Sequence, residues 1–212
     1  MVILPLTYWG SVEHFANLLQ GGEEAIIDLG ENYVKRSERN RTEIVTPTGG
    51  MVLSVPLIKA NRPRTPMRDM RIDNSKRWQH QHWVSILSAY KSSPYFDFYG
   101  EEFAPFFERP YEFLVDWNRD LCHTAMRALG IGKELNISER WINAEATTTF
   151  DYDLRGAFSP KPRLAMADER FAAQPYCQVF ADRAPFAPNI SILDLLFCEG
   201  LAATTILRSC LR

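Results

Sequence analysis

The sequence predicts one α/β domain, with a small mixed β-sheet built mainly from the N-terminal third and covered by four to five α-helices. Three observations lead to this prediction. Residues 1–74 contain short apolar runs separated by turn residues, and from residue 75 the hydrophobic period becomes that of helices. The length of 212 residues suits one domain, and 46% hydrophobic residues provide enough material for its core.

Turn chemistry divides the first 74 residues into short elements. A helix is expected from Ser11, a plausible N-cap, to a stop at Gly21. A Pro/Gly cluster at 47–50 lies between runs of Thr, Ile and Val and predicts a hairpin. Strands are expected at 2–6, 24–30, 42–58 (the hairpin) and 70–74.

The part from 75 to 130 is predicted to be helical. Trp83, Ile86, Leu87 and Tyr90 recur at i, i+3, i+4 and i+7, which defines one face of a helix. A second long helix is expected to begin after Pro110 and to stop at Gly130. Residues 131–175 lack a period and predict an irregular connection, whereas 176–212 predict a strand, "YCQVF", followed by helices split at Gly200.

Composition narrows the class of protein. The net charge of −2 and a pI of about 6.1 argue against a general nucleic-acid binder. No apolar run approaches the length of a membrane span, and the four cysteines have no spacing typical of a metal site, so no metal is predicted. We therefore expect a cytoplasmic protein with reduced thiols.

Charge is distributed unevenly along the chain. Residues 33–77 contain eleven Lys/Arg against four acids, whereas residues 97–120 contain seven acids and two arginines. If the basic side chains share one face, they favour a phosphate or carboxylate partner. The alternative is that the two segments pair with each other through surface salt bridges.

The basic run near the start of this region is a candidate anion site, and its residues are Lys35, Arg36, Arg39, Asn40 and Arg41. Guanidinium groups offer forked donors that match phosphate and carboxylate oxygens. Composition alone favours a solvated loop. General catalytic motifs such as GxGxxG, GxSxG and HExxH are absent from the sequence.

Two other side chains invite an acid–base role. His82 lies beside the apolar helix face, where it is either a general base or a packed histidine bonded to the backbone. Asp194 follows Ser191 by three residues ahead of an apolar run, which is the spacing of a capping box, and we prefer the cap.

Taken together, six segments resemble the WbqC-like family of bacterial proteins. They cover most of 1–130 and 175–200 and read "YVKRSERNRTEI", "LSVPL", "MRIDNSKRWQHQHWVSILSAYKSSPYFDFY", "LVDWN", "YCQVF" and "PNISILDLLFCEG". The family typically opens with Gln-Pro-x-Tyr-x-Pro. This chain keeps Pro5 and Tyr8 of that element but has Leu4 and Gly10 in place of the glutamine and the second proline.

The resemblance implies a role in O-antigen-type cell-surface polysaccharide biosynthesis, because genes of the family often lie in such clusters. It also favours the basic run as a cradle for an anionic small molecule such as an activated sugar. The sequence does not identify a cofactor. The side chains expected to complete the pocket are Tyr8, His82, Tyr90, Tyr95 and Gln178.

Two functions remain open at this stage. One is a transferase in which His82 acts as the base. The other is a non-catalytic partner of polysaccharide-biosynthesis proteins, which the missing catalytic motif and the aromatic segment 95–107 support.

Overall fold

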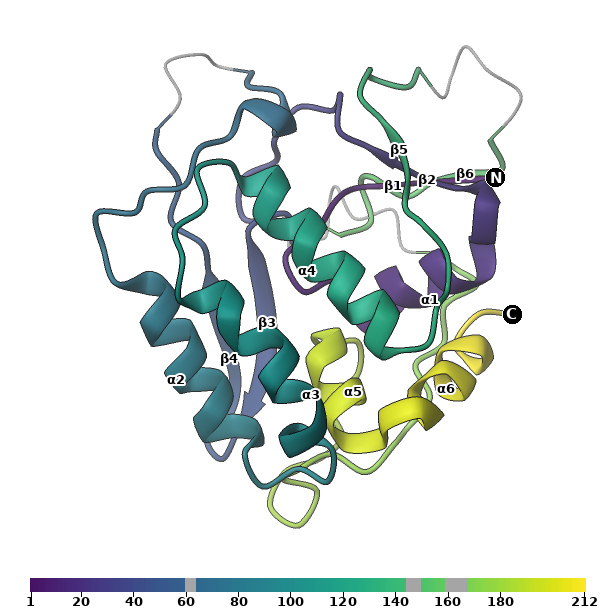
Figure 1. Cartoon of the computed structure of the whole chain (residues 1–212). Helices are drawn as coiled ribbons and strands as arrows, with labels where there is room; N and C mark the ends of the chain where they lie inside the picture. Colours follow the sequence, from purple (N-terminus) through teal and green to yellow (C-terminus); the bar gives the residue numbers. More distant parts are fainter. Residues whose placement is uncertain (60–63, 144–149, 159–167) are drawn as a thin grey trace.

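A computed structural model of the chain describes residues 1–59, 64–143, 150–158 and 168–212. Its main sheet has the strand order β5-β2-β1-β6, and every pair in it is parallel. The strands are β1 (Val2–Leu4), β2 (Ala25–Asp28), β5 (Asn136–Ser138) and β6 (Tyr152–Asp153). Helix α1 (Val12–Gly21) connects β1 to β2 and lies against the sheet (Figure 1).

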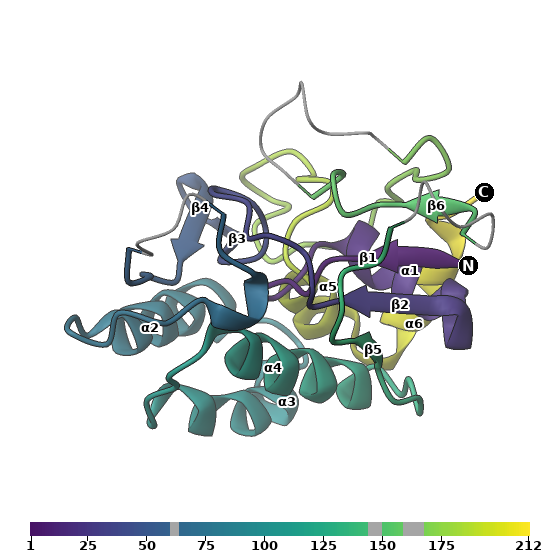
Figure 2. The same cartoon turned by 90° about the horizontal axis from the view of Figure 1, so that it is seen from above.

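A second, antiparallel sheet consists of the hairpin β3 (Arg41–Thr46) and β4 (Gly49–Ser54). The hairpin lies apart from the parallel strands, beside helix α2 (Trp78–Tyr90), as Figure 2 shows from above. The α/β class is confirmed. The strands are divided between two sheets, because the hairpin pairs with itself and leaves β1 and β2 to pair with later segments.

The remaining helices form two groups. Helices α3 (Phe96–Phe103) and α4 (Leu114–Ala128) lie near α2, whereas α5 (Ile192–Glu199) and α6 (Ala203–Ser209) lie beneath α1 in Figure 1. The predicted stops are confirmed at Gly130 and Gly200, whose φ angles are +69° and +57°. Glycine adopts this left-handed region without the penalty that a Cβ atom brings.

Several predicted elements are wrong. Residues 176–180 form no strand. The side chain of Gln178 in this segment is buried, and its amide donates a hydrogen bond to Asp194. Residues 70–74 make only isolated bridges, at Arg71 and Ile72. In contrast, β5 and β6 lie within the segment expected to be irregular, because strands of three and two residues are too short to show a period.

An aromatic cluster fixes the helical group to the loop after β1. Trp117 on α4 is fully buried and makes ring contacts with Tyr8, Trp78, Phe107 and Tyr111, with centroids 5.1 to 6.1 Å apart. Aromatic pairs of this geometry contribute about 0.5–1.5 kcal/mol each beyond burial. The cluster therefore anchors the loop that reaches the candidate site.

None of the helices within the described ranges has both the length and the apolar character needed to cross a lipid bilayer.

Candidate functional site

A cavity of about 330 Å³ lies at the carboxyl edge of the parallel sheet. It is lined by residues of the segment after β1 and by residues of the segment after β6. Because β1 pairs with β2 on one side and with β6 on the other, the chain order reverses here, and open α/β sheets bind ligands at such points. The lining residues are Ser11, Glu13, Arg36, Ser37, Glu38, Arg41, Thr42, Glu43, Val52, Ala157, Phe158, Asn189, Ile190 and Ser191.

Two helix N-termini meet at this cavity. Ser11 is the N-cap of α1 and Ser191 is the N-cap of α5, and the two residues form an antiparallel bridge. The Val12 amide donates to the Ile190 carbonyl over 3.0 Å, in the segment that leads into α5. Each helix N-terminus carries a partial positive charge, so their meeting favours an anion in the cavity.

Left-handed backbone conformations gather at the same place. Trp9, Arg36 and Asn189 have φ angles of 48°, 61° and 54°, and two of the three line the cavity. The carbonyl of Trp9 accepts hydrogen bonds from the hydroxyls of Thr42 and Ser191, which also line it. Such conformations cost about 1–3 kcal/mol each and concentrate at functional sites.

Glu38 joins three segments around the cavity. Its carboxylate Oε2 accepts from the Ser11 amide over 3.0 Å, and its backbone carbonyl accepts from the Tyr8 amide over 2.8 Å. Its own amide donates to the Phe158 carbonyl over 3.1 Å. Burial raises the pKa of this carboxyl to about 7, although the hydrogen bond from Ser11 opposes the rise. A carboxyl that titrates near neutrality is suited to proton transfer.

Two polar atoms at the cavity lack a partner. The Arg41 Nε is buried and has no hydrogen bond within the described chain. The buried Ser11 hydroxyl meets no partner there at ordinary hydrogen-bond geometry, although it lies close enough to the Glu38 carboxylate to lower the pKa of that group. Arg41 is half-buried at the start of β3, whereas Arg36 is exposed at the cavity wall. Buried polar groups are almost always satisfied, so these two donors indicate a place where a ligand would supply acceptors.

The basic run does not act as one unit. Arg36 and Arg41 line the cavity, but Arg39 is 1% exposed and makes a two-pronged ion pair with Glu31, with Nε–Oε1 and Nη2–Oε2 distances of 2.7 and 2.5 Å. Asn40 donates to the Val55 carbonyl over 3.0 Å. Arg39 and Asn40 are therefore buried structural residues, whereas Arg36 and Arg41 are free to contact a ligand. The composition of the run does not show which residues become buried.

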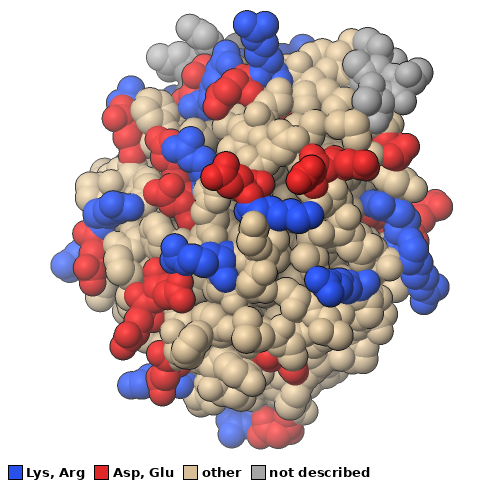
Figure 3. All heavy atoms as spheres, turned by 45° about the vertical axis from the view of Figure 1, so that its right-hand side comes forward, with Lys and Arg blue, Asp and Glu red and all other residues tan. Residues whose placement is uncertain are grey.

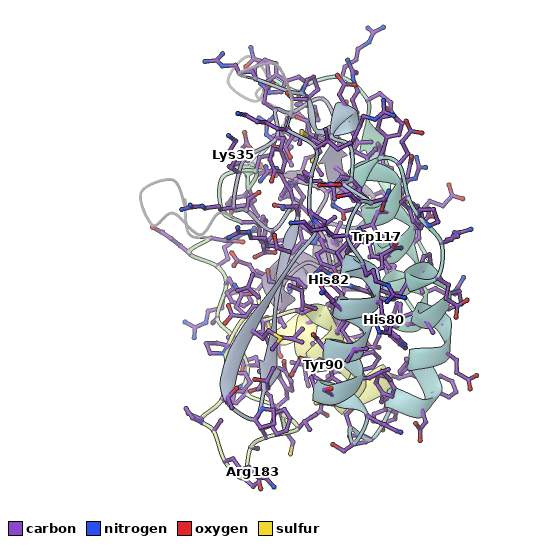
Figure 4. The ribbon with its side chains drawn as sticks, turned by 90° about the vertical axis from the view of Figure 1, so that its left-hand side faces the viewer. Lys35, His80, His82, Tyr90, Trp117 and Arg183 are labelled. Atoms are coloured by element: carbon purple, nitrogen blue, oxygen red, sulfur yellow. The ribbon has the colours of Figure 1, made fainter. Side chains whose placement is uncertain are left out.

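Lys35 is exposed, and Figure 4 places it well away from His82.

Tyr8 and His82 form a separate buried pair. The Tyr8 hydroxyl lies 2.8 Å from the His82 Nδ1, and the imidazole stacks on the Tyr8 ring and packs edge-on against Trp78. Burial lowers the pKa of His82 to about 4, so the ring is neutral at pH 7. Figure 4 shows His82 in the interior near Trp117, and neither member of the pair is among the described side chains that line the cavity.

Tyr90 and Gln178 lie in a third cluster, around Asp194. Gln178 Nε2 donates to Asp194 Oδ1 over 3.1 Å and contacts the Tyr176 hydroxyl over 3.3 Å. The Tyr90 hydroxyl accepts from the Val45 amide over 3.3 Å. Asp194 is fully buried, and this desolvation raises the pKa of its carboxyl.

The predicted capping box is half correct. The Ser191 hydroxyl accepts from the Leu193 amide over 3.3 Å and caps α5. The Asp194 carboxylate does not reach back to the Ser191 amide, which donates instead to the Glu43 carbonyl. Tyr95 is not among the described residues that line the cavity. It is 42% exposed, and its ring lies so close to Gly200 that a Cβ atom at that position would be only 2.7 Å away.

Of the cavity residues, sequence reasoning predicted only Arg36 and Arg41 as site residues, and those it missed include Ser11 as a ligand group, Glu13, Glu38 and Asn189. Glu38 interrupts the basic run, and in the sequence it stands out only as one of the four acids of residues 33–77. Its signal is its position between arginines, but its place at the cavity depends on hydrogen bonds with Ser11 and Phe158, which are distant in sequence.

The surface has no large patch of one charge on the face drawn in Figure 3, where basic and acidic side chains are interspersed. Arg71 and Glu112 form an exposed ion pair between the basic and acidic segments of the sequence. Within the described ranges, no group of three or more His, Cys, Asp or Glu side chains is arranged to hold a metal ion.

Comparison with known proteins finds one curated relative and one family model that match the chain. It is 27% identical over 227 residues to "Uncharacterized protein Rv1507c" of Mycobacterium tuberculosis, an alignment that covers 92% of each chain. No solved structure matches it. Residues 13–158, which include every cavity residue except Ser11 and the three from the 189–191 segment, match the WbqC-like protein family. The chain therefore belongs to the WbqC-like protein family.

Proposed function

We propose that this protein is a transferase of cell-surface polysaccharide biosynthesis, and that its cavity holds the anionic group of an activated sugar. Membership of the WbqC-like family supports the polysaccharide setting. The observation that carries the binding role is the meeting of two helix N-termini with Arg36, Arg41 and the unpartnered Ser11 hydroxyl around one cavity.

The donors are arranged for phosphate or carboxylate oxygens. A guanidinium group offers forked N–H donors. The two helix N-termini add the positive ends of their dipoles and not free amides, because the Val12, Glu13 and Leu193 amides already donate within the protein. A partly enclosed site strengthens each of these interactions relative to water. We therefore expect Arg41 and Ser11 to hold one anionic group, while the exposed Arg36 contributes from the rim.

Glu38 is our candidate for the proton-transferring residue. In a glycosyl transfer, an acceptor hydroxyl loses its proton to the Glu38 carboxylate as its oxygen bonds to the sugar carbon. The bond from that carbon to the phosphate oxygen breaks, and the guanidinium groups hold the departing phosphate. The base role of His82 stays a prediction, and its neutral ring enclosed by Tyr8 and Trp78 supports a packing role instead.

The binding role is tested by titration calorimetry with uridine diphosphate and with inorganic pyrophosphate. We expect Arg41→Ala to weaken the binding of both by about tenfold or more, because each charge-assisted hydrogen bond contributes about 1.5–3 kcal/mol. Arg77→Ala is the matched control, since Arg77 is exposed and outside the cavity lining. Equal affinity of the wild type and Arg41→Ala would remove the proposed anion site.

An interaction role is the second candidate, and one observation favours it. Phe98 on α3 is 70% exposed, although the nearby Tyr99 and Phe103 are buried. Tyr95 is also exposed, at 42%, and the rings of Tyr95 and Phe98 both contact Tyr99, so two neighbouring aromatic side chains reach the surface together. A single exposed apolar side chain is ordinary, whereas a group of them is a candidate contact surface. Phe98→Ser would then abolish capture of the other proteins of a polysaccharide assembly while leaving pyrophosphate binding unchanged.

A further inference from the structure

The cavity is lined by acidic and basic side chains that form no ion pairs with one another in the described chain. Three carboxylates, those of Glu13, Glu38 and Glu43, line it together with the guanidinium groups of Arg36 and Arg41. None of the five belongs to an ion pair within 4.0 Å in the part of the chain that the structure describes. Elsewhere in the same molecule, arginines close to carboxylates do pair, as Arg39 does with Glu31.

The two acids nearest the helix N-termini are fixed in place by neutral donors. Glu13 Oε2 accepts from Asn189 Nδ2 over 2.8 Å, and Glu38 Oε2 accepts from the Ser11 amide over 3.0 Å. Glu13 is 9% exposed, so its carboxylate is largely removed from water. A desolvated carboxylate is costly unless a cation or strong donors face it, which makes this wall receptive to a positive group.

Glu13 and Glu38 belong to different elements, and their hydrogen bonds give this wall a fixed shape. Glu13 lies in the first turn of α1, and Asn189, which it holds, has a left-handed φ of 54°. Glu38 is held from both sides by backbone hydrogen bonds to Tyr8 and Phe158. Fixed groups recognise a ligand at lower entropic cost than mobile ones do.

We propose that the cavity binds a ligand that carries an amine as well as a phosphate, namely a phosphorylated amino sugar. Its phosphate lies at Arg41 and Ser11, and its ammonium lies at the acidic wall of Glu13 and Glu38, with Glu13 as its ion-pair partner and Glu38 beside it, where the Glu38 carboxylate can still accept a proton. This inference rests on the proposed function, since it assigns the anion to the same arginines and adds the amine. The cavity volume of about 330 Å³ suits a compact ligand, because it is near the lower limit of small-molecule sites.

The test compares three sugars that differ at one position. Glucosamine 1-phosphate, N-acetylglucosamine 1-phosphate and glucose 1-phosphate are titrated into the full-length protein by calorimetry. The first carries an ammonium group, the second carries a neutral amide, and the third carries a hydroxyl. We expect glucosamine 1-phosphate to bind about tenfold or more tightly than either of the others, because only its ammonium can pair with the carboxylates.

Variants of the acidic wall identify the residues responsible. In the double variant Glu13→Gln with Glu38→Gln, the preference for glucosamine 1-phosphate is expected to fall to about onefold, while the affinity for glucose 1-phosphate does not decrease. Glutamine keeps an oxygen that can accept from Asn189 and from the Ser11 amide, so the wall retains its shape. Glu108→Gln, at an exposed position outside the cavity lining, is the control and should keep the preference.

The outcomes separate the two proposals. Equal affinity of the wild type for all three sugars overturns the amine site but leaves the anion site intact. If none of the three binds, and pyrophosphate does not bind either, both proposals are overturned. If the amine preference persists in the double variant, the ammonium lies elsewhere and the assignment to Glu13 and Glu38 is wrong.

Discussion

Ser11 and Ser191, the N-caps of two helices separated by 180 residues of sequence, lie side by side as an antiparallel bridge. The bridge brings the N-termini of α1 and α5 to one wall of the cavity. The two serines differ in their hydrogen bonds. The Ser191 hydroxyl accepts from the Leu193 amide, whereas the buried Ser11 hydroxyl meets no partner at ordinary hydrogen-bond geometry in the described chain.

This difference in hydrogen bonding predicts different effects of substituting each serine by alanine. Ser191→Ala removes a helix cap and should lower the free energy of unfolding by about 0.5–2 kcal/mol. Ser11→Ala removes an unsatisfied hydroxyl and should leave that free energy unchanged or raise it by about 1 kcal/mol, while weakening pyrophosphate binding. Urea unfolding and calorimetry measure the two quantities. Equal destabilisation by both substitutions would mean that the Ser11 hydroxyl has a structural partner.

Arg39 is expected to act through folding and not through ligand binding. Arg39→Ala leaves the buried Glu31 carboxylate without its partner, and we expect a loss of about 3–5 kcal/mol in the free energy of unfolding. Arg71→Ala, which breaks the exposed pair with Glu112, should cost about 1 kcal/mol or less. Urea denaturation of both variants measures the difference. A mild effect of Arg39→Ala would contradict the assignment.

Glu38 predicts a pH dependence of stability with a definite sign. Its pKa rises from 4.5 to about 7 on folding, so the folded state binds more protons than the unfolded state between these values. The stability from this group is therefore fully present below pH 4.5 and is lost as the pH rises through about 7. Relative to Glu38→Gln, the wild type should lose stability between pH 5 and pH 8. A constant difference between the two proteins would show that Glu38 titrates normally.

Tyr8 and His82 provide a test of structural against functional roles. Tyr8→Phe keeps the ring but removes the hydroxyl that bonds to the His82 Nδ1, so we expect a loss of about 1–3 kcal/mol in the free energy of unfolding. Pyrophosphate affinity should not change, because neither residue is among the described cavity residues. Tyr152→Phe, at a 43% exposed site, is the control and should change stability by about 0.5 kcal/mol at most. Loss of pyrophosphate binding in folded Tyr8→Phe would extend the site to this pair.

The sequence could predict those elements that local rules specify. Helices α2 and α4 have a clear period, and the positive φ angles of Gly130 and Gly200 are a requirement that glycine meets at little cost. The strands β5 and β6 could not be predicted, because they owe their pairing to β2 and β1 and not to any pattern of their own.

The site depended even more on distant contacts. Composition does not distinguish Arg39 from Arg41 within the basic run. In the structure Arg39 forms an ion pair with Glu31, whereas Arg41 lines the cavity. The hydrogen bonds that hold Glu38 at the cavity involve Ser11, Tyr8 and Phe158, which only the fold brings together. A sequence can therefore indicate that an anion site is present, but not which guanidinium group serves it.

The most direct test of the account is a crystal structure of the protein with glucose 1-phosphate. We predict that phosphate oxygens lie within about 3.2 Å of the Ser11 hydroxyl and of the Arg41 Nε, in the cavity between the two helix N-termini. A phosphate bound beside His82 or at another surface, with this cavity holding only water, would contradict the central claim.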